Sequence, residues 1–134
     1  IGDAIIKLTP LAATDSESGE QAGRVIAETY LRLKQYNEAR EAIEAQPRLR
    51  QSTGGREMLA RIAFLQGDKV AADKLYASIE TESDEAKEYL AKQAIARKDW
   101  PRARQLTEAL VKKHPDQAQY RASLEAIAKA EAGK

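Results

Sequence analysis

The sequence contains few side chains that could carry out catalysis. Its only histidine, His114, lies between a lysine and a proline in an expected loop. A general base needs a partner and a pocket, and the sequence shows neither, so we interpret His114 as a solvated loop residue. The absence of Cys excludes disulfides and thiolate zinc sites. We expect no catalytic residue, metal or cofactor, and classify the chain as not an enzyme.

Two short motifs could be mistaken for ligand loops. Gly54-Gly55 lacks the following Lys and Ser/Thr of a phosphate-binding loop, and we interpret it as a flexible start to the helix around Glu57. Asp15-Ser16-Glu17 lacks the spacing of a calcium loop. Most other carboxylates have Lys or Arg four residues away, which is typical of a solvated helix face.

The composition indicates the fold class and argues against some kinds of partner. With 22 basic and 21 acidic residues, the net charge of +1 offers no clustered excess of cations for nucleic acid. No stretch approaches the roughly 18 apolar residues that would span a bilayer. Hydrophobic residues make up 43%, as in globular proteins, and the common residues are good helix formers. The composition therefore predicts a mostly helical chain.

An internal repeat organises the chain. Segments 30–39, 63–72 and 94–103 align on a turn and on the alanine that follows it. These alanines, Ala39, Ala72 and Ala103, are 33 and 31 residues apart. So regular a spacing predicts repeated helical hairpins.

Turn residues place the ends of these hairpins. Gly67-Asp68 supplies a C-terminal cap followed by an N-cap, and Lys98-Asp99 occupies the same place before Pro101, which the first turn of a helix tolerates. The sequence at 114–116 ends the third hairpin, and we expect Asp116 to cap a last helix over 117–131.

Near the N-terminus, Thr9-Pro10 is expected to stop a short helix over 3–8, before a loop over 11–19. We predict a longer connection over 47–53. This gives about eight helices in a single domain over 1–134. Its parts are an orphan helix and loop (1–19), three repeats (20–52, 53–83 and 84–115) and a terminal helix (116–134). Because the chain opens with Ile1 rather than Met, we expect it to be part of a longer protein.

The pattern resembles the tetratricopeptide repeat family, whose unit is a hairpin of about 34 residues. Tyr30 matches the large residue of the first helix, segment 35–40 is close to the family's turn phrase, and Pro115 matches its closing proline. The small packing residues are Ala27, Ala60 and Ala91, whereas the family's early Trp is replaced by Gly23, Arg56 and Lys87. The resemblance implies an all-α solenoid of antiparallel hairpins, a right-handed superhelix that binds proteins.

In such arrays the first helix of each hairpin lines a concave groove. The groove positions in this chain are Arg24, Glu28, Leu31, Arg32, Glu57, Arg61, Phe64, Leu65, Glu88, Lys92 and Ile95. They include three pairs of opposite charge spaced i,i+4, Arg24–Glu28, Glu57–Arg61 and Glu88–Lys92, which either neutralise each other or form a mixed-charge recognition surface. The three glutamates would repel a carboxylate-ending peptide, the ligand of chaperone-binding family members.

Two aromatic residues, Phe64 and Trp100, stand out in the repeats. Phe64 is either a core residue or an exposed apolar anchor for a partner. Trp100 begins a helix where the family often has a large residue, and we interpret it as packing.

We therefore expect a scaffold that docks a partner protein's helix or extended segment on Leu31, Phe64 and Ile95. The alternative is a structural spacer within a longer solenoid, and the third reading, an α-helical enzyme, lacks a pocket with perturbed ionisable groups. Self-association is compatible with the sequence, whereas nucleic acid and membrane insertion are not expected. Repeats of this kind occur in bacterial envelope proteins that organise exopolysaccharide secretion. If the chain belongs to such a protein, we expect it in the periplasm, and otherwise in the cytoplasm.

Overall fold

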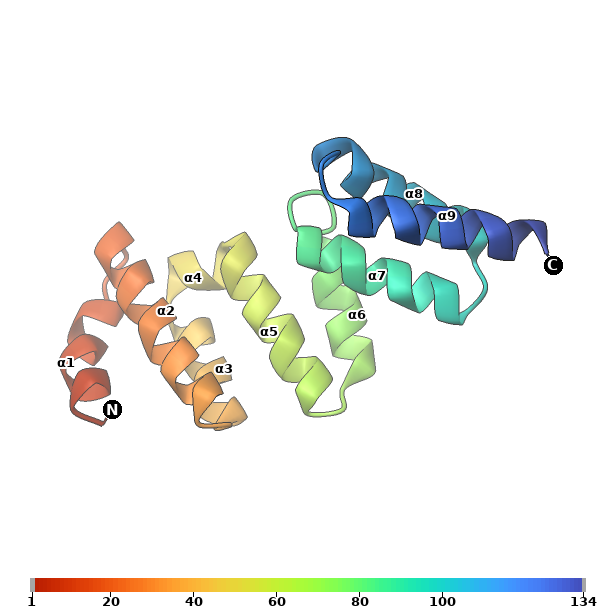
Figure 1. The fold of residues 1–134 in the computed structure, drawn as a ribbon. Helices are drawn as coiled ribbons and strands as arrows, with labels where there is room; N and C mark the ends of the chain where they lie inside the picture. Colours follow the sequence, from red (N-terminus) through yellow and green to blue (C-terminus); the bar gives the residue numbers. More distant parts are fainter. Residues whose placement is uncertain (1, 134) are drawn as a thin grey trace. The chain divides into compact units, whose positions relative to one another are not determined.

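The computed structural model describes the backbone of residues 2–133 and the side chains of residue 5 and residues 8–133. All regular secondary structure in this part of the chain is helical, as predicted (Figure 1). The helices are α1 (Gly2–Ala12), α2 (Glu17–Arg32), α3 (Tyr36–Ala45), α4 (Pro47–Gln51), α5 (Thr53–Leu65), α6 (Lys69–Ser78), α7 (Asp84–Ala96), α8 (Trp100–Lys113) and α9 (Ala118–Ala132).

The chain divides into two compact units, and the division falls within α6, between Leu75 and Tyr76. In unit 1, α2 packs against α1 and α3, and α4 contacts α2, α3 and α5 (Figure 1). In unit 2, α8 packs against both α7 and α9. One continuous domain over 1–134 stays a prediction.

Three helix-to-helix turns share one backbone conformation. Lys34, Gly67 and Lys98 have φ of 59°, 81° and 61°, and they are 33 and 31 residues apart, the spacing of the aligned alanines. The following residue in each turn donates its N–H to the carbonyl five residues earlier: Gln35 to Tyr30 (2.9 Å), Asp68 to Ala63 (2.8 Å) and Asp99 to Ala94 (2.8 Å). This is the Schellman arrangement that ends helices. The sequence repeat is thus also a repeat of backbone structure.

The predicted caps of the second and third hairpins are confirmed. Asp68 accepts the N–H of Ala71 (3.1 Å), and Asp99 accepts the N–H of Arg102 (3.3 Å). Pro101 lies in the first turn of α8, and α8 ends at Lys113, directly before His114. At the last helix the prediction is wrong: the N-cap residue is Gln117, without a side-chain cap bond, rather than Asp116.

The N-terminal boundaries differ from the prediction. Thr9-Pro10 does not stop α1, which continues to Ala12 with Pro10 in its last turn. A proline at this position still removes one backbone hydrogen bond, and the packing of α1 along α2 offsets that cost. The predicted loop over 11–19 is correspondingly short, because Ser16 caps α2 by accepting the N–H of Gly19 (3.0 Å).

The predicted connection over 47–53 contains a further helix, α4, which brings the helices of the described residues to nine rather than about eight. Pro47 is its first residue, and the side chain of Gln46 accepts the N–H of Leu49 (2.9 Å). Leu49 is fully buried. The buried leucine supplies the tertiary energy that so short a helix lacks by itself.

Gly54-Gly55 is not a flexible lead-in, because α5 begins at Thr53. Gly55 is buried, and a Cβ on it would lie 1.8 Å from the carbonyl oxygen of Leu49. Only glycine permits this approach of α4 to α5.

Each unit has its own apolar core. In unit 1 the central buried residues are Ala27, Ala39, Ile43, Leu49, Met58 and Ile62, with Tyr30 and Leu31 packed against them. In unit 2, Ala94, Ala103 and Ile127 are buried together and Trp100 packs against them. Trp100 is therefore a packing residue, as predicted.

Candidate functional site

Unit 2 contains a pocket of about 230 Å³ that gathers part of the predicted groove. It is lined by α7 (Glu88, Ala91, Lys92, Ile95), α8 (Thr107, Leu110) and α9 (Gln119, Tyr120, Ser123). Thus Glu88, Lys92 and Ile95, three of the predicted groove residues, line one pocket. Apolar side chains from α7 and α8 lie beside polar groups from α7 and α9, an arrangement typical of recognition sites.

A tyrosine–glutamate pair closes one part of this pocket. The hydroxyl of Tyr120 donates a hydrogen bond to the Glu88 carboxylate, 32 positions away in the chain. This hydrogen bond, together with burial, raises the pKa of Tyr120 to about 12. Tyr120 therefore stays protonated at neutral pH, where it acts as a hydrogen-bond donor rather than as a proton-transfer group.

The pocket holds one carboxylate, Glu88, and one ammonium group, Lys92. The Glu88 carboxylate accepts a hydrogen bond from Tyr120, and the predicted ion pair between Glu88 and Lys92 does not form. Lys92 is exposed and pairs with no described side chain. Ile95, close by on α7, is 38% exposed. An incoming group thus meets an ammonium group and an accessible aliphatic surface on the same helix.

His114 is not the solvated loop residue that we expected. Its Nε2 lies 2.7 Å from Oδ2 of Asp84 and must donate, because an ionised carboxylate only accepts. Its ring centroid is 5.9 Å from that of Tyr120. Lys113 also binds Asp84 (3.0 Å). Burial opposes ionisation of Asp84, but the hydrogen bonds from His114 and Lys113 outweigh it and lower the pKa of this carboxyl.

The α2 members of the predicted groove lie in unit 1. Arg24 pairs with Glu20 (3.4 Å), one turn earlier, rather than with Glu28. Its guanidinium also lies against α5, where a Cβ on Gly54 would be 2.4 Å from Nη1. Glu28 is exposed. The mutual neutralisation that we considered for Arg24–Glu28 is therefore made with a different carboxylate.

Leu31 and Arg32 stand at the end of α2. Leu31 is half-buried and packs against the unit 1 core. Arg32 is exposed, and its Nη2 is 3.4 Å from the Thr29 hydroxyl. Leu31 thus contributes mainly to folding, and Arg32 to the surface.

The α5 members also lie in unit 1. Glu57 is half-buried and Arg61 is exposed. Phe64 and Leu65 are 53% and 57% exposed, which agrees with the anchor alternative for Phe64 rather than the core alternative. Since Leu31 and Phe64 belong to unit 1 and Ile95 to unit 2, the single apolar line through all three stays a prediction.

Sequence reasoning missed the α9 side of the pocket, although the repeat could have found it. Glu57 and Glu88 are 31 residues apart, and another 31 residues lead to Gln119; the same step leads from Lys92 to Ser123. Both Gln119 and Ser123 line the pocket. The last helix therefore continues the pattern of first helices over at least these two positions.

No protein-family model matches the chain, and no curated protein is detectably similar to it in sequence. Within residues 2–133, no helix is both long and apolar enough to cross a membrane. Among the described side chains, those of residue 5 and residues 8–133, no three His, Asp or Glu gather as metal ligands would.

Proposed function

We propose that this chain is a tetratricopeptide-like helical-repeat module that binds another protein through the exposed faces of its first helices. The observation that carries the proposal is the pocket of unit 2, where α7 and α9 present side chains from equivalent repeat positions. The repeated turns at Lys34, Gly67 and Lys98 support the hairpin-stack arrangement. Stacked hairpins bury their seams against neighbours and leave a continuous surface for ligands.

The chemistry of the pocket favours recognition of a protein side chain. Ile95, Ala91 and Leu110 offer apolar contact, and Lys92 supplies a cation for a carboxylate or carbonyl of the partner. Tyr120 is engaged with Glu88, which fixes the wall from which Gln119 and Ser123 project. Buried aliphatic contact supplies affinity and the charge supplies specificity.

The proposal is tested by selecting short random peptides on the intact chain and measuring their binding by fluorescence anisotropy. The double variant Ile95→Asp/Lys92→Glu should weaken the selected peptides by about tenfold or more, because a buried charge replaces an aliphatic contact. Lys112→Glu is the matched charge reversal, since Lys112 is exposed on α8 and outside the pocket. Equal binding by both variants would show that this pocket is not the site.

The alternative is a spacer that positions other domains. It is favoured by the packing of α1 on α2 and of α9 on α8, each as a helix of a neighbouring hairpin would pack. Under that alternative, no peptide is selected and the pocket variants have no effect. A bacterial envelope setting belongs to the same proposal, and fractionation of cells that express the full gene product tests it.

A further inference from the structure

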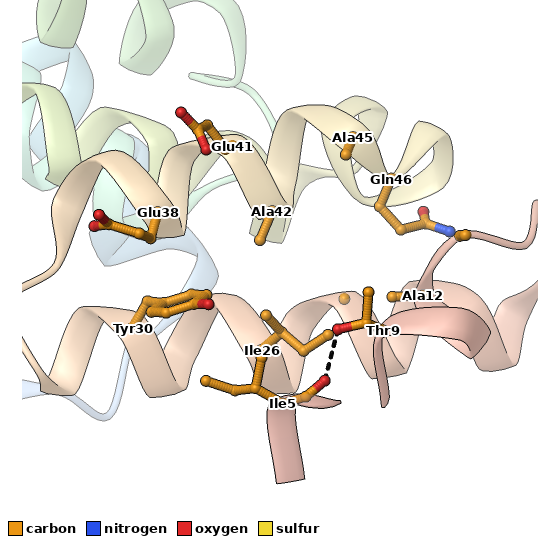
Figure 2. A pocket seen from close by; sticks show the side chains of 12 residues that line it. Ile5, Thr9, Ala12, Ile26, Tyr30, Glu38, Glu41, Ala42, Ala45 and Gln46 are labelled. Atoms are coloured by element: carbon orange, nitrogen blue, oxygen red, sulfur yellow. Dashed lines mark hydrogen bonds between the residues drawn. The ribbon is translucent and has the colours of Figure 1, made fainter. Parts of the chain in front are cut away.

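A second pocket, of about 390 Å³, lies in unit 1 and is bounded by α1, α2 and α3 (Figure 2). Its apolar lining includes Ile5 from α1 and Ile26 and Tyr30 from α2. Figure 2 shows Ile5, Ile26 and Tyr30 facing the space between the helices. A volume of this size falls in the range of ligand sites rather than of packing defects.

Small residues keep this pocket open. Ala12 on α1 and Ala42 and Ala45 on α3 all line it, at positions where a larger side chain would fill the space. Gly23 on α2 lets the side chain of Gln46 approach, because a Cβ there would lie 2.9 Å from Gln46 Cγ. Apolar walls without contact partners forfeit dispersion energy, which an inserted aliphatic side chain would restore.

Two carboxylates on α3 give the pocket a negative edge. Glu38 and Glu41 both line it and are exposed. Neither forms an ion pair or hydrogen bond with a described side chain. Glu44, on the same helix but outside this pocket, instead lies 4.0 Å from Arg40. The unpaired carboxylates on α3 are therefore those at the pocket.

The two carboxylates lie toward one end of the pocket (Figure 2). Figure 2 shows Glu38 and Glu41 toward the Tyr30 end, whereas Thr9 and Ala12 lie at the other. The Tyr30 hydroxyl makes no hydrogen bond within the described part of the chain. Two carboxylates spaced i,i+3 lie on neighbouring turns of one helix face and can act on the same cation. The pocket thus pairs an apolar interior with an acidic edge.

We propose that this pocket binds a segment of another protein in which an aliphatic residue adjoins a Lys or Arg. The aliphatic side chain enters between Ile5, Ile26 and Ala42, and the cation lies over Glu38 and Glu41. The cleft is too small for a whole helix, so one or two side chains are the inserted element. Acidic segments are excluded because they would meet two unpaired carboxylates.

This site differs in charge from the pocket of unit 2. That pocket holds an unpaired ammonium group, Lys92, beside the Glu88 carboxylate, which is hydrogen-bonded to Tyr120. The charged residues that line the pocket of unit 1 are two unpaired carboxylates. The two pockets share no lining residue, so binding at one can be lost while binding at the other is retained.

The test selects short random peptides that bind the intact chain and then measures their binding to variants in which the pocket is filled. Ala42→Leu fills the pocket from α3. If circular dichroism shows that Ala42→Leu does not fold, Ala45→Leu, at an exposed position of the same helix, takes its place. Ala109→Leu on exposed α8 surface is the matched enlargement elsewhere. Peptides that lose binding to the filled variants, but not to Ala109→Leu, report this pocket.

Those peptides are expected to carry an aliphatic residue next to Lys or Arg. Glu38→Gln/Glu41→Gln should weaken them by about fivefold, because two exposed charge pairs are lost, and Glu44→Gln should not. The weakening should shrink as salt is added. NMR shifts on binding are expected at Gly23, Ile26 and Ala42 rather than on α7 and α9.

Three results would overturn the proposal. The first is a set of pocket-dependent peptides without basic residues, and the second is a selection in which no peptide distinguishes the filled variants from the wild type. The third is sedimentation in which the chain self-associates and Ala42→Leu abolishes that association. This last result would assign the pocket to a second copy of the chain.

Discussion

In unit 1, buried backbone and amide groups hold neighbouring elements together, whereas in unit 2 charged side chains make many of the contacts between elements. Gln46, 1% exposed, donates to the Thr14 carbonyl (2.7 Å) and accepts the N–H of Leu49 (2.9 Å), while Gly55 lies against the Leu49 carbonyl. In unit 2, Asp84 binds both Lys113 (3.0 Å) and His114 (2.7 Å).

Further polar pairs join the elements of unit 2. Arg102 pairs with Glu80, Arg104 with Glu131, and Tyr120 with Glu88. Helices that follow one repeat pattern can therefore be held together in two ways. A close backbone approach tolerates no added atom, whereas ion pairs at a surface can be lost at modest cost.

The largest expected effect is that of Gly55→Ala in unit 1. The new Cβ would overlap the Leu49 carbonyl oxygen at 1.8 Å, so α4 and α5 must separate. We expect a loss of about 3 kcal/mol in unfolding free energy, measured by urea denaturation. Gly54→Ala is the control, because it meets only the flexible end of Arg24 and alanine favours helix, so its stability should be unchanged or slightly higher. Equal losses would contradict the close-approach explanation.

The next largest effect is expected for Gln46→Ala, which removes a buried amide that is hydrogen-bonded to the backbone of Thr14 and Leu49. Both backbone groups lose their partner, and we expect a loss of about 2 kcal/mol. Gln66→Ala removes a comparable amide whose contacts with Arg40 (2.9 Å) and Asn37 (3.1 Å) are exposed, and it should cost about 0.5 kcal/mol or less. Hydrogen exchange should show faster exchange over α4 in the first variant and not in the second.

In unit 2 the pH dependence of Asp84 should be visible. Its folded pKa lies below the ordinary 3.8, because the hydrogen bonds from His114 and Lys113 outweigh burial. The stabilisation is therefore fully present above pH 3.8 and is lost as the pH falls through the lower folded pKa. Asp84→Asn should lower Tm by about 2–5 °C at neutral pH and leave a smaller difference in acid.

Trp100, the only tryptophan, lies in unit 2 and reports this transition by fluorescence. Asp15→Asn is the comparison in unit 1, because the Asp15 side chain is 73% exposed and pairs with Arg48 at 3.1 Å. It should change Tm less than Asp84→Asn does. The reverse order would contradict the assignment of charge pairing to unit 2.

The smallest effect concerns the turn that both units share. Lys34 and Lys98 have φ near +60°, which costs a non-glycine residue energy. Replacing either by Gly should stabilise the chain by about 0.5–1 kcal/mol, and by a similar amount in each unit. Gly67→Lys should destabilise it by about the same amount, since Gly67 has φ 81°. Thermal denaturation would detect each change, and a gain in only one unit would show that the turns are not equivalent.

The sequence by itself determined the helical class, the repeat and most turns. These follow from groups only a few residues apart: Gly67 and Asp68 end one helix and begin the next, and Asp99 caps α8. It also predicted that Glu88, Lys92 and Ile95 share a face, because that follows from the helical period alone.

Only the tertiary structure decided which distant groups meet. Gln46 reaches Thr14 over 32 positions, His114 reaches Asp84 over 30, and Tyr120 reaches Glu88 over 32. Each separation is close to the length of one repeat, so these contacts depend on how separate helices pack, which local preference does not determine. The same holds for α4, stabilised by the burial of Leu49, and for the pocket of unit 1 between α1, α2 and α3.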